Sequence, residues 1–225
     1  MNKFLKATSF YAVACIASNL IAAEPKAENA FEGVSLNALI GYGQVDAKHR
    51  TVYGTSGGRY QGTFSGGALN VKAGLGYGKN LRDSYNWGAE LYGFYNPLRT
   101  ETFLANPIAN AIIGRNFGGG VKTTIGYFLA QSTLGYVGVG AEGSVFNFKM
   151  KTQNFNQLTN SRFLWATGPV AGVKVALSSA TSLVVEGNYM FYQAMRISGL
   201  NGISPLSSRI SPRVLSLNLG LSINL

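Results

Sequence analysis

Charged residues are scarce in this chain, and cysteine is almost absent. Charged residues make up 12% of the sequence, against about 25% in an ordinary soluble domain, which is too few to cover a typical water-exposed surface. The single cysteine, Cys15, lies within the first apolar stretch, so we expect no disulfide and no thiol chemistry in the mature protein. After residue 33 the sequence has no run of about 18 apolar residues, which excludes a helical membrane span there.

Hydrophobic residues and glycine are abundant instead. Hydrophobic residues make up 46% of the chain and aromatic residues 12%, and the 29 glycines follow no three-residue period. This composition argues against both a collagen-like and a disordered chain. A length of 225 residues fits a single domain. The composition therefore predicts one β-rich domain with an apolar exterior.

The first residues have the features of a secretory signal peptide. Lys3 and Lys6 precede a mostly apolar stretch that ends in small residues, and we expect cleavage after Ala23. A transmembrane anchor is an alternative, but the apolar stretch is short for a span. Lipidation at Cys15 is a second alternative. The predicted boundaries are 1–23 for the signal peptide, 24–33 for a polar lead-in and 34–225 for the folded domain.

From residue 34 onward, apolar and polar residues alternate in eight segments of about ten residues, the length at which a tilted strand crosses a bilayer. Short turns and long stretches rich in Gly, Asn, Ser and Thr alternate between the segments, which is typical of bacterial outer-membrane barrels. We therefore predict an all-β fold, a closed antiparallel eight-stranded up-and-down transmembrane β-barrel. Its long loops, expected outside the cell, are 47–64, 97–118, 149–162 and 193–213.

A soluble barrel with an apolar interior is the alternative to a lipid-facing barrel. Aromatic residues on the apolar face favour the lipid-facing barrel, because they fall near both rims, where amphipathic rings meet the two membrane interfaces. These residues are Tyr77, Trp87 and Tyr127 near one rim and Tyr42, Tyr95, Trp165 and Phe191 near the other.

Six charged residues share the polar face of the predicted strands. In an antiparallel hairpin, the residue numbers of two directly opposed residues have a mean that falls in the turn. For three Lys–Glu combinations this mean falls at an expected turn, at Leu81, Ser132 and Ala180. Side chains fill the interior of an eight-stranded barrel, so these charges would block a wide pore, while a narrow ion path stays open as an alternative. The predicted interior ion pairs are Lys72–Glu90, Lys122–Glu142 and Lys174–Glu186.

The last predicted strand resembles the assembly signal of outer-membrane barrels, in the spacing of Asn218, Gly220, Ile223 and Leu225. The family usually has Phe where this chain has Leu225. From about Val34 to the end, the chain resembles the small eight-stranded outer-membrane proteins, namely the OmpA-like transmembrane domain and the Opa- and Ail-like surface proteins. This resemblance implies a bacterial outer-membrane location and insertion by the barrel-assembly machinery, and we expect a monomeric barrel.

The net charge of +10 is concentrated in the predicted loops, where Glu101 is the one acid. Such a surface would face lipopolysaccharide phosphates or bind anionic host glycans or receptors, and export makes nucleic acid an implausible partner. We expect a surface-exposed structural or adhesive protein, although the basic residues could equally serve only to anchor the barrel among lipid phosphates. The candidate polyanion-binding residues are Lys48, Arg50, Arg59, Arg115, Lys149, Lys151 and Arg162; Arg99, Arg196, Arg209 and Arg213 are the other basic residues of these loops.

A lipid A-modifying enzyme is the alternative from another functional class. Its general base would be the single histidine, His49, oriented by Asp46. We favour a solvated loop histidine, because no serine is placed beside it by a motif. The glycines at 118–120 lead into a strand rather than a helix, and the sequence has no metal-ligand cluster. We therefore expect no catalytic residue, no metal and no cofactor.

Overall fold

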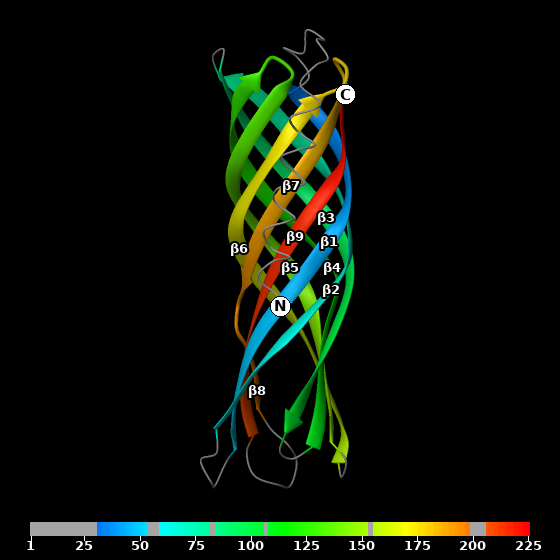
Figure 1. Ribbon diagram of the computed structural model, residues 1–225, viewed down its shortest axis with the longest axis vertical. Coiled ribbons are helices and arrows are strands. Elements are labelled where there is room, and N and C mark those ends of the chain that lie inside the picture. The colour runs from blue at the N-terminus through cyan, green and yellow to red at the C-terminus, as the bar shows by residue number, and fades with distance from the viewer. Residues whose placement is uncertain (1–30, 54–58, 82–83, 106–107, 153–154, 199–205) are drawn as a thin grey trace, which may run out of the picture.

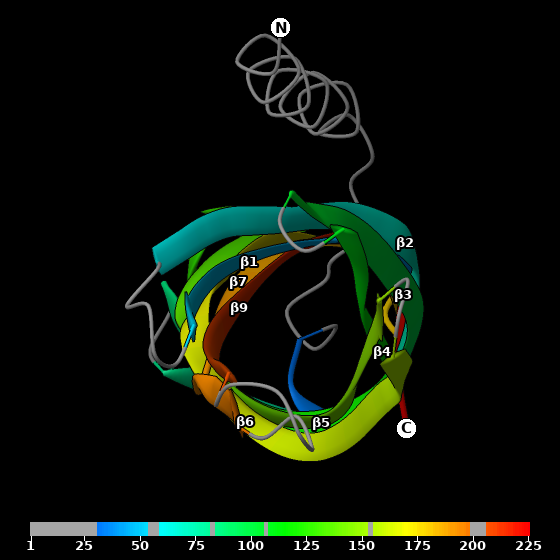
Figure 2. The ribbon, with the colours of Figure 1, turned by 90° about the horizontal axis from the view of Figure 1, so that it is seen from below.

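The computed structural model describes residues 31–53, 59–81, 84–105, 108–152, 155–198 and 206–225, which form a long closed barrel (Figures 1 and 2). The predicted signal peptide and most of the predicted lead-in lie outside these ranges. In the described residues, no helix is both long and apolar enough to cross a membrane. The strands are β1 (Gly33–Tyr53), β2 (Arg59–Leu81), β3 (Tyr85–Ala105), β4 (Ile108–Ala130), β5 (Thr133–Thr152), β6 (Phe155–Ala176), β7 (Thr181–Tyr192), β8 (Met195–Ser198) and β9 (Leu206–Asn224).

The strands β1 to β7 pair antiparallel in chain order, β7 pairs with β9, and β1 pairs with β9 to close the barrel. Both β7 and β8 pair with β9, and they follow one another as two parts of a single strand. The described residues therefore form an antiparallel barrel of eight strands, and the predicted fold class is confirmed. The one-residue register change between β7 and β8 has the form of a β-bulge.

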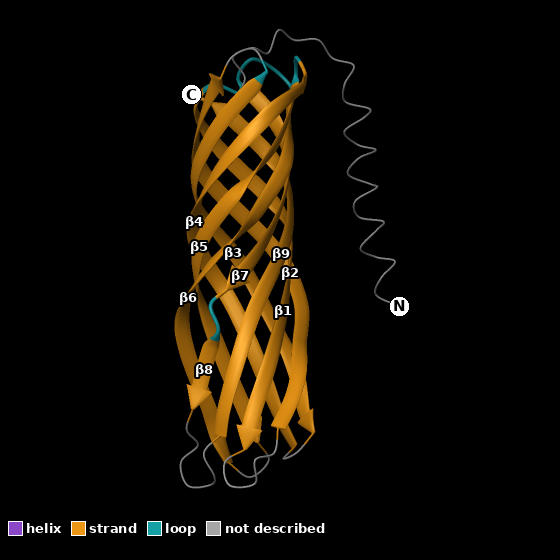
Figure 3. Cartoon of the chain, turned by 90° about the vertical axis from the view of Figure 1, so that its left-hand side faces the viewer, coloured by secondary structure: helices purple, strands orange, loops and turns teal. Residues whose placement is uncertain are grey.

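The strands are about twice as long as a bilayer requires. The strands β1 to β6 have 20 to 23 residues each, whereas about 9 to 11 residues of a tilted strand cross a membrane. Most of the residues that we predicted as long loops are therefore strand, and that prediction is wrong. We call the half with the short turns and Leu225 the membrane half, and the other half the extension (Figure 3).

The membrane half has an apolar outer surface and a polar interior. Along β9, for example, Leu215 and Leu219 are exposed while Ser216 and Asn218 are buried. This alternation matches the predicted lipid-facing strands. The exposed large apolar residues include Val34, Leu36, Ile40, Tyr42, Leu69, Leu75, Tyr77, Trp87, Leu91, Tyr95, Phe117, Val121, Ile125, Tyr127, Val137, Val139, Trp165, Phe191, Leu217 and Leu221.

In the extension the polarity of the two faces is reversed, with apolar side chains pointing inward and polar side chains pointing outward. We call this reversal the exchange of faces. On β1 the inward Val45 and Ala47 are fully buried, while Lys48 and Arg50 point outward and are exposed. The period of two continues, but apolar side chains now point inward. A sequence search for outward apolar residues does not detect such strands, which explains why we predicted loops.

The extension consists of two four-stranded leaves. The backbone ladder between β2 and β3 ends at Val71 and Tyr95, and the ladder between β6 and β7 ends at Ala166 and Tyr192. Beyond these points, the described ladders join β8, β9, β1 and β2 into one leaf and β3 to β6 into the other. The leaves diverge toward the bottom of Figure 1.

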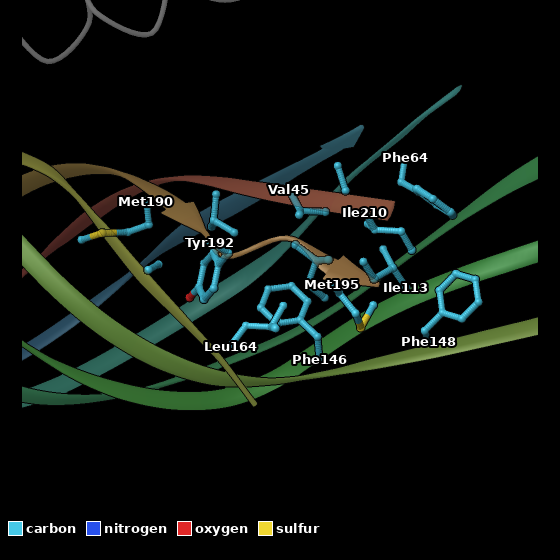
Figure 4. Close-up of a cluster of buried hydrophobic side chains, with 14 of the residues drawn as sticks. Val45, Phe64, Ile113, Phe146, Phe148, Leu164, Met190, Tyr192, Met195 and Ile210 are labelled. Carbon is cyan, nitrogen blue, oxygen red and sulfur yellow. The ribbon is translucent and has the colours of Figure 1, made fainter. Parts of the chain in front are cut away.

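An apolar core fills the space between the leaves (Figure 4). Both leaves contribute to it, because Phe64 and Ile210 come from one leaf and Ile113 and Phe146 from the other. All four side chains are almost completely buried. The core therefore joins the two leaves where backbone hydrogen bonds do not.

Candidate functional site

The interior of the membrane half contains all six charged residues that we predicted there. Five are buried, and Lys174 is partly buried. Glu186 is at the centre of the cluster: its carboxylate accepts hydrogen bonds from Lys72 Nζ at 2.7 Å, from Tyr136 Oη at 2.9 Å and from Lys122 Nζ. Glu90 completes the cluster, with its carboxylate 3.0 Å from Lys122 Nζ and 3.7 Å from Lys72 Nζ.

The partners differ from the predicted ones. Glu186 lies opposite Gly172 rather than Lys174, and Lys122 lies opposite Gly140 rather than Glu142. The predicted Lys122–Glu142 and Lys174–Glu186 pairs are therefore wrong.

Lys72 and Glu90 do interact, although their strands place Lys72 opposite Phe94. The register centres the three hairpins one or two residues away from the predicted turn centres. Moving a turn centre by one residue moves each cross-strand partner by two positions, and moving it by two residues moves each partner by four. Because both numbers are even, every partner changes while every side chain stays on the predicted face.

A second buried cluster lies beside the apolar core. Arg115 Nη1 is 3.2 Å from Glu142 Oε1 and donates to Tyr192 Oη at 2.6 Å. Arg115 Nη2 donates to Asn96 Oδ1 at 3.2 Å. Glu142 also accepts hydrogen bonds from Tyr92 Oη, at 3.2 Å, and from Tyr192 Oη. The true partner of Glu142 is thus Arg115, which we had predicted on the outer surface.

Arg115 is only 2% exposed, so its assignment to a polyanion-binding surface is wrong. The cause is a register irregularity between Arg115 and Gly118. Two successive residues, Asn116 and Phe117, are both exposed there, which reverses the inward and outward positions along β4. Arg115 and Lys122 consequently both point inward although they are an odd number of residues apart.

The other basic candidates lie on the outer surface where their side chains are described. Lys48, Arg50, Lys149 and Arg162 are exposed. The side chains of Arg59 and Lys151 lie outside the described residues. Arg99 is also exposed and pairs with Glu101 at 3.3 Å.

His49 does not form the catalytic pair considered above. Its ring is 4% exposed and packs at 5.0 Å from the ring of Phe64, and burial lowers its pKa below the usual value. Asp46 lies on the outer side of the same strand and accepts a hydrogen bond from Ser65 Oγ at 2.7 Å. The expectation of a solvated loop histidine is therefore wrong as well. Among the described residues, no group of three or more His, Cys, Asp or Glu side chains is placed to hold a metal ion.

The residues of the predicted assembly signal lie on β9 beside β1. Asn218 is buried and accepts a hydrogen bond from Asn70 Nδ2 at 2.6 Å. Gly220 lies so close to β1 that an added Cβ would stand 2.0 Å from the carbonyl oxygen of Ala38, which accounts for glycine at this position. Ile223 and Leu225 are exposed on the lipid-facing side. Their role in assembly stays a prediction.

Comparison with solved structures shows the same architecture. OprG, an outer membrane protein from Pseudomonas aeruginosa, matches with a TM-score of 0.55 and 14% identity over 88% of this chain and 99% of its own. The chain has the fold of a small outer-membrane β-barrel. No family model matches the sequence, and no curated protein matches it significantly.

Two further structures match with lower scores. Ail from Yersinia pestis, solved in complex with the heparin analogue sucrose octasulfate, matches with a TM-score of 0.38 and 14% identity over 85% of this chain and 99% of its own. The outer membrane protease OmpT from Escherichia coli matches with a TM-score of 0.40 and 10% identity over 91% of this chain and its whole length. At these scores neither likeness indicates what this barrel does.

Proposed function

We propose that this chain is a surface-exposed outer-membrane barrel that acts through its outer surface, as a structural and adhesive protein for anionic glycans. The supporting observation is the exchange of faces in the extension, where basic side chains such as Lys48 and Arg50 point outward over an apolar core. Such a surface is suited to water rather than to lipid. From Tyr42 to Tyr53 the tilted strand β1 rises about 28 Å above the apolar belt, which makes the extension a projecting structure.

The interior gives no support to a pore. A path along the axis would pass the Glu186 cluster, the Arg115 cluster and then the apolar core between the leaves. At the turn end, the ring of Phe31 packs against the ring of Phe128. The backbone carbonyl oxygen of Phe31 accepts a hydrogen bond from Asn86 Nδ2 at 3.1 Å. Side chains thus occupy several levels of the lumen, and a steady ionic current is not expected.

Binding of the folded barrel to a sulfated polysaccharide tests the proposal. The protein in detergent should bind immobilised heparin at low salt and release it as salt rises, because exposed charges are screened over about 10 Å at 0.1 M. Neutral dextran serves as the control matrix. If the folded protein does not bind heparin at low salt, the adhesive role is refuted.

The orientation of the extension can be tested separately. Lys48→Cys introduces a thiol on its outer surface, at an exposed position. In intact cells, a membrane-impermeant maleimide should label this variant. Labelling only after the cells are broken would place the extension in the periplasm and overturn the proposal.

A further inference from the structure

Three arginines form a line across adjacent strands of the extension. Arg50 of β1 lies directly opposite Arg209 of β9, and Arg209 lies directly opposite Arg196 of β8. All three side chains are exposed. We call these residues the arginine row. Since neighbouring strands are about 4.8 Å apart, the two ends of the row are about 10 Å apart along the sheet.

Nothing in the described part of the sheet neutralises this row. Like charges directly opposite one another destabilise a sheet, and the residue opposite Arg50 on its other side is the uncharged Gln61. The nearest acid along β1, Asp46, lies opposite Arg213 and is bonded by Ser65. The row therefore places like charges side by side, which destabilises the sheet, and a bound anion would remove this repulsion.

The row lies too far from the apolar belt for membrane phosphates. Arg50 is eight positions beyond Tyr42, the last outward apolar residue among the described side chains of β1, which corresponds to a height of about 20 Å for a tilted strand. Arg213 lies lower: its guanidinium group is 5.7 Å from the ring of Phe191, an outward residue of the belt. The lower arginine is in the position to meet lipid headgroups, and the row is not.

We propose that Arg50, Arg196 and Arg209 form a binding row for a sulfated polysaccharide, with the chain of the ligand running across β1, β9 and β8. This inference rests on the proposed function and names its site and ligand class. A guanidinium group donates two parallel hydrogen bonds to an oxyanion, so three adjacent guanidinium groups can bind successive sulfates. The other leaf has no equivalent among its described side chains, since Arg99 pairs with Glu101 and Lys149 lies opposite Thr159.

The test compares two variants that lose the same charge. The row variant is Arg50→Gln, Arg196→Gln and Arg209→Gln, and the control variant, on the other leaf, is Arg99→Gln, Lys149→Gln and Arg162→Gln. Affinity is measured in detergent with a fluorescent heparin octasaccharide at two salt concentrations, after gel mobility with and without boiling has shown that each protein is folded. We expect at least a tenfold loss of affinity for the row variant and less than a threefold loss for the control.

The outcomes separate the row from the general proposal. Equal losses in both variants, or no loss in the row variant, would refute the row while leaving glycan binding in place. Absence of binding by the unaltered protein would refute the proposed function itself. Replacing the three row arginines by lysine keeps the charge and removes the paired donors, so an intermediate affinity is expected, and full affinity would refute the role of the guanidinium groups. Stronger binding of the row to lipopolysaccharide than to heparin would overturn the ligand class.

Discussion

Glu186 is the residue whose loss should most disturb the membrane half. Its carboxylate is completely buried and is shared by the ammonium groups of Lys72 and Lys122. Glu186→Gln removes the negative charge with little change of shape. The two lysines would then share Glu90 alone, at 3.7 and 3.0 Å. Two buried positive charges would face a single negative charge.

Removing one partner of a buried ion pair costs about 3 to 5 kcal/mol, because the remaining charge stays desolvated. We expect Glu186→Gln to lower the free energy of unfolding by this amount. The control is Glu101→Gln, which breaks the exposed pair with Arg99 and should cost less than about 1 kcal/mol. Urea unfolding of both variants in lipid vesicles, followed by tryptophan fluorescence and gel mobility, measures the difference. Equal stability of the two variants would refute the reasoning.

A double-mutant cycle tests which partners are real. Lys122→Met and Glu186→Gln should be coupled. The loss of unfolding free energy in the double variant should be at least about 1 kcal/mol smaller than the sum of the two single losses. Lys122→Met and Glu142→Gln should be additive within about 0.5 kcal/mol, because Glu142 interacts with Arg115 instead. Coupling in the second cycle and additivity in the first would restore the register that the sequence predicted.

Three further outcomes follow from burial and exposure. Leu219→Arg, in the middle of the lipid-facing part of β9, should lower the free energy of unfolding in vesicles by about 2 to 4 kcal/mol, whereas Ser211→Glu in the extension, which places a carboxylate opposite Lys48, should not lower it. Burial lowers the pKa of His49, so His49 binds a proton more readily in the unfolded chain than in the folded one. The free energy of unfolding should therefore fall as the pH drops below about 6.5. His49→Phe should flatten this part of the pH profile, and an unchanged profile would contradict the prediction. Intact-mass measurement should find a mature N-terminus at Glu24, and a diacylglyceryl group on Cys15 would disprove that cleavage site.

The membrane half was predictable because lipid imposes a simple rule. The outward residues between the two rims form an apolar band, and β9 follows this rule from Leu215 to Leu225 without interruption. The prediction that the charged side chains point into the barrel followed from the same alternation. Their partners did not, because a pairing depends on the turn centre, and an error of two residues in one hairpin moves Lys72 from Glu90 to Phe94.

The position of Arg115 could not be predicted from alternation alone. The irregularity at Asn116 and Phe117 reverses the faces of β4, and a bulge leaves no distinct mark in a sequence already rich in glycine. The predicted pairing also concealed the signal, because assigning Lys122 to Glu142 left no carboxylate in need of a partner. Only the observed register, which places Lys122 opposite Gly140, leaves the buried Glu142 in need of another cation, and Arg115 supplies it.

The exchange of faces also locates the edge of the membrane. Among the described side chains of β1, the last outward apolar residue is Tyr42 and the next outward residue is Gln44; on β9 the change occurs between Leu215 and Arg213. The register places Gln44 directly opposite Leu215 and Asp46 opposite Arg213, so two strands that are far apart in the sequence change character within two residues of each other. Independent loops would have no reason to agree in this way. The agreement is what a flat lipid boundary imposes on neighbouring strands, and it is the physical reason for treating the extension as a water-exposed structure above the bilayer.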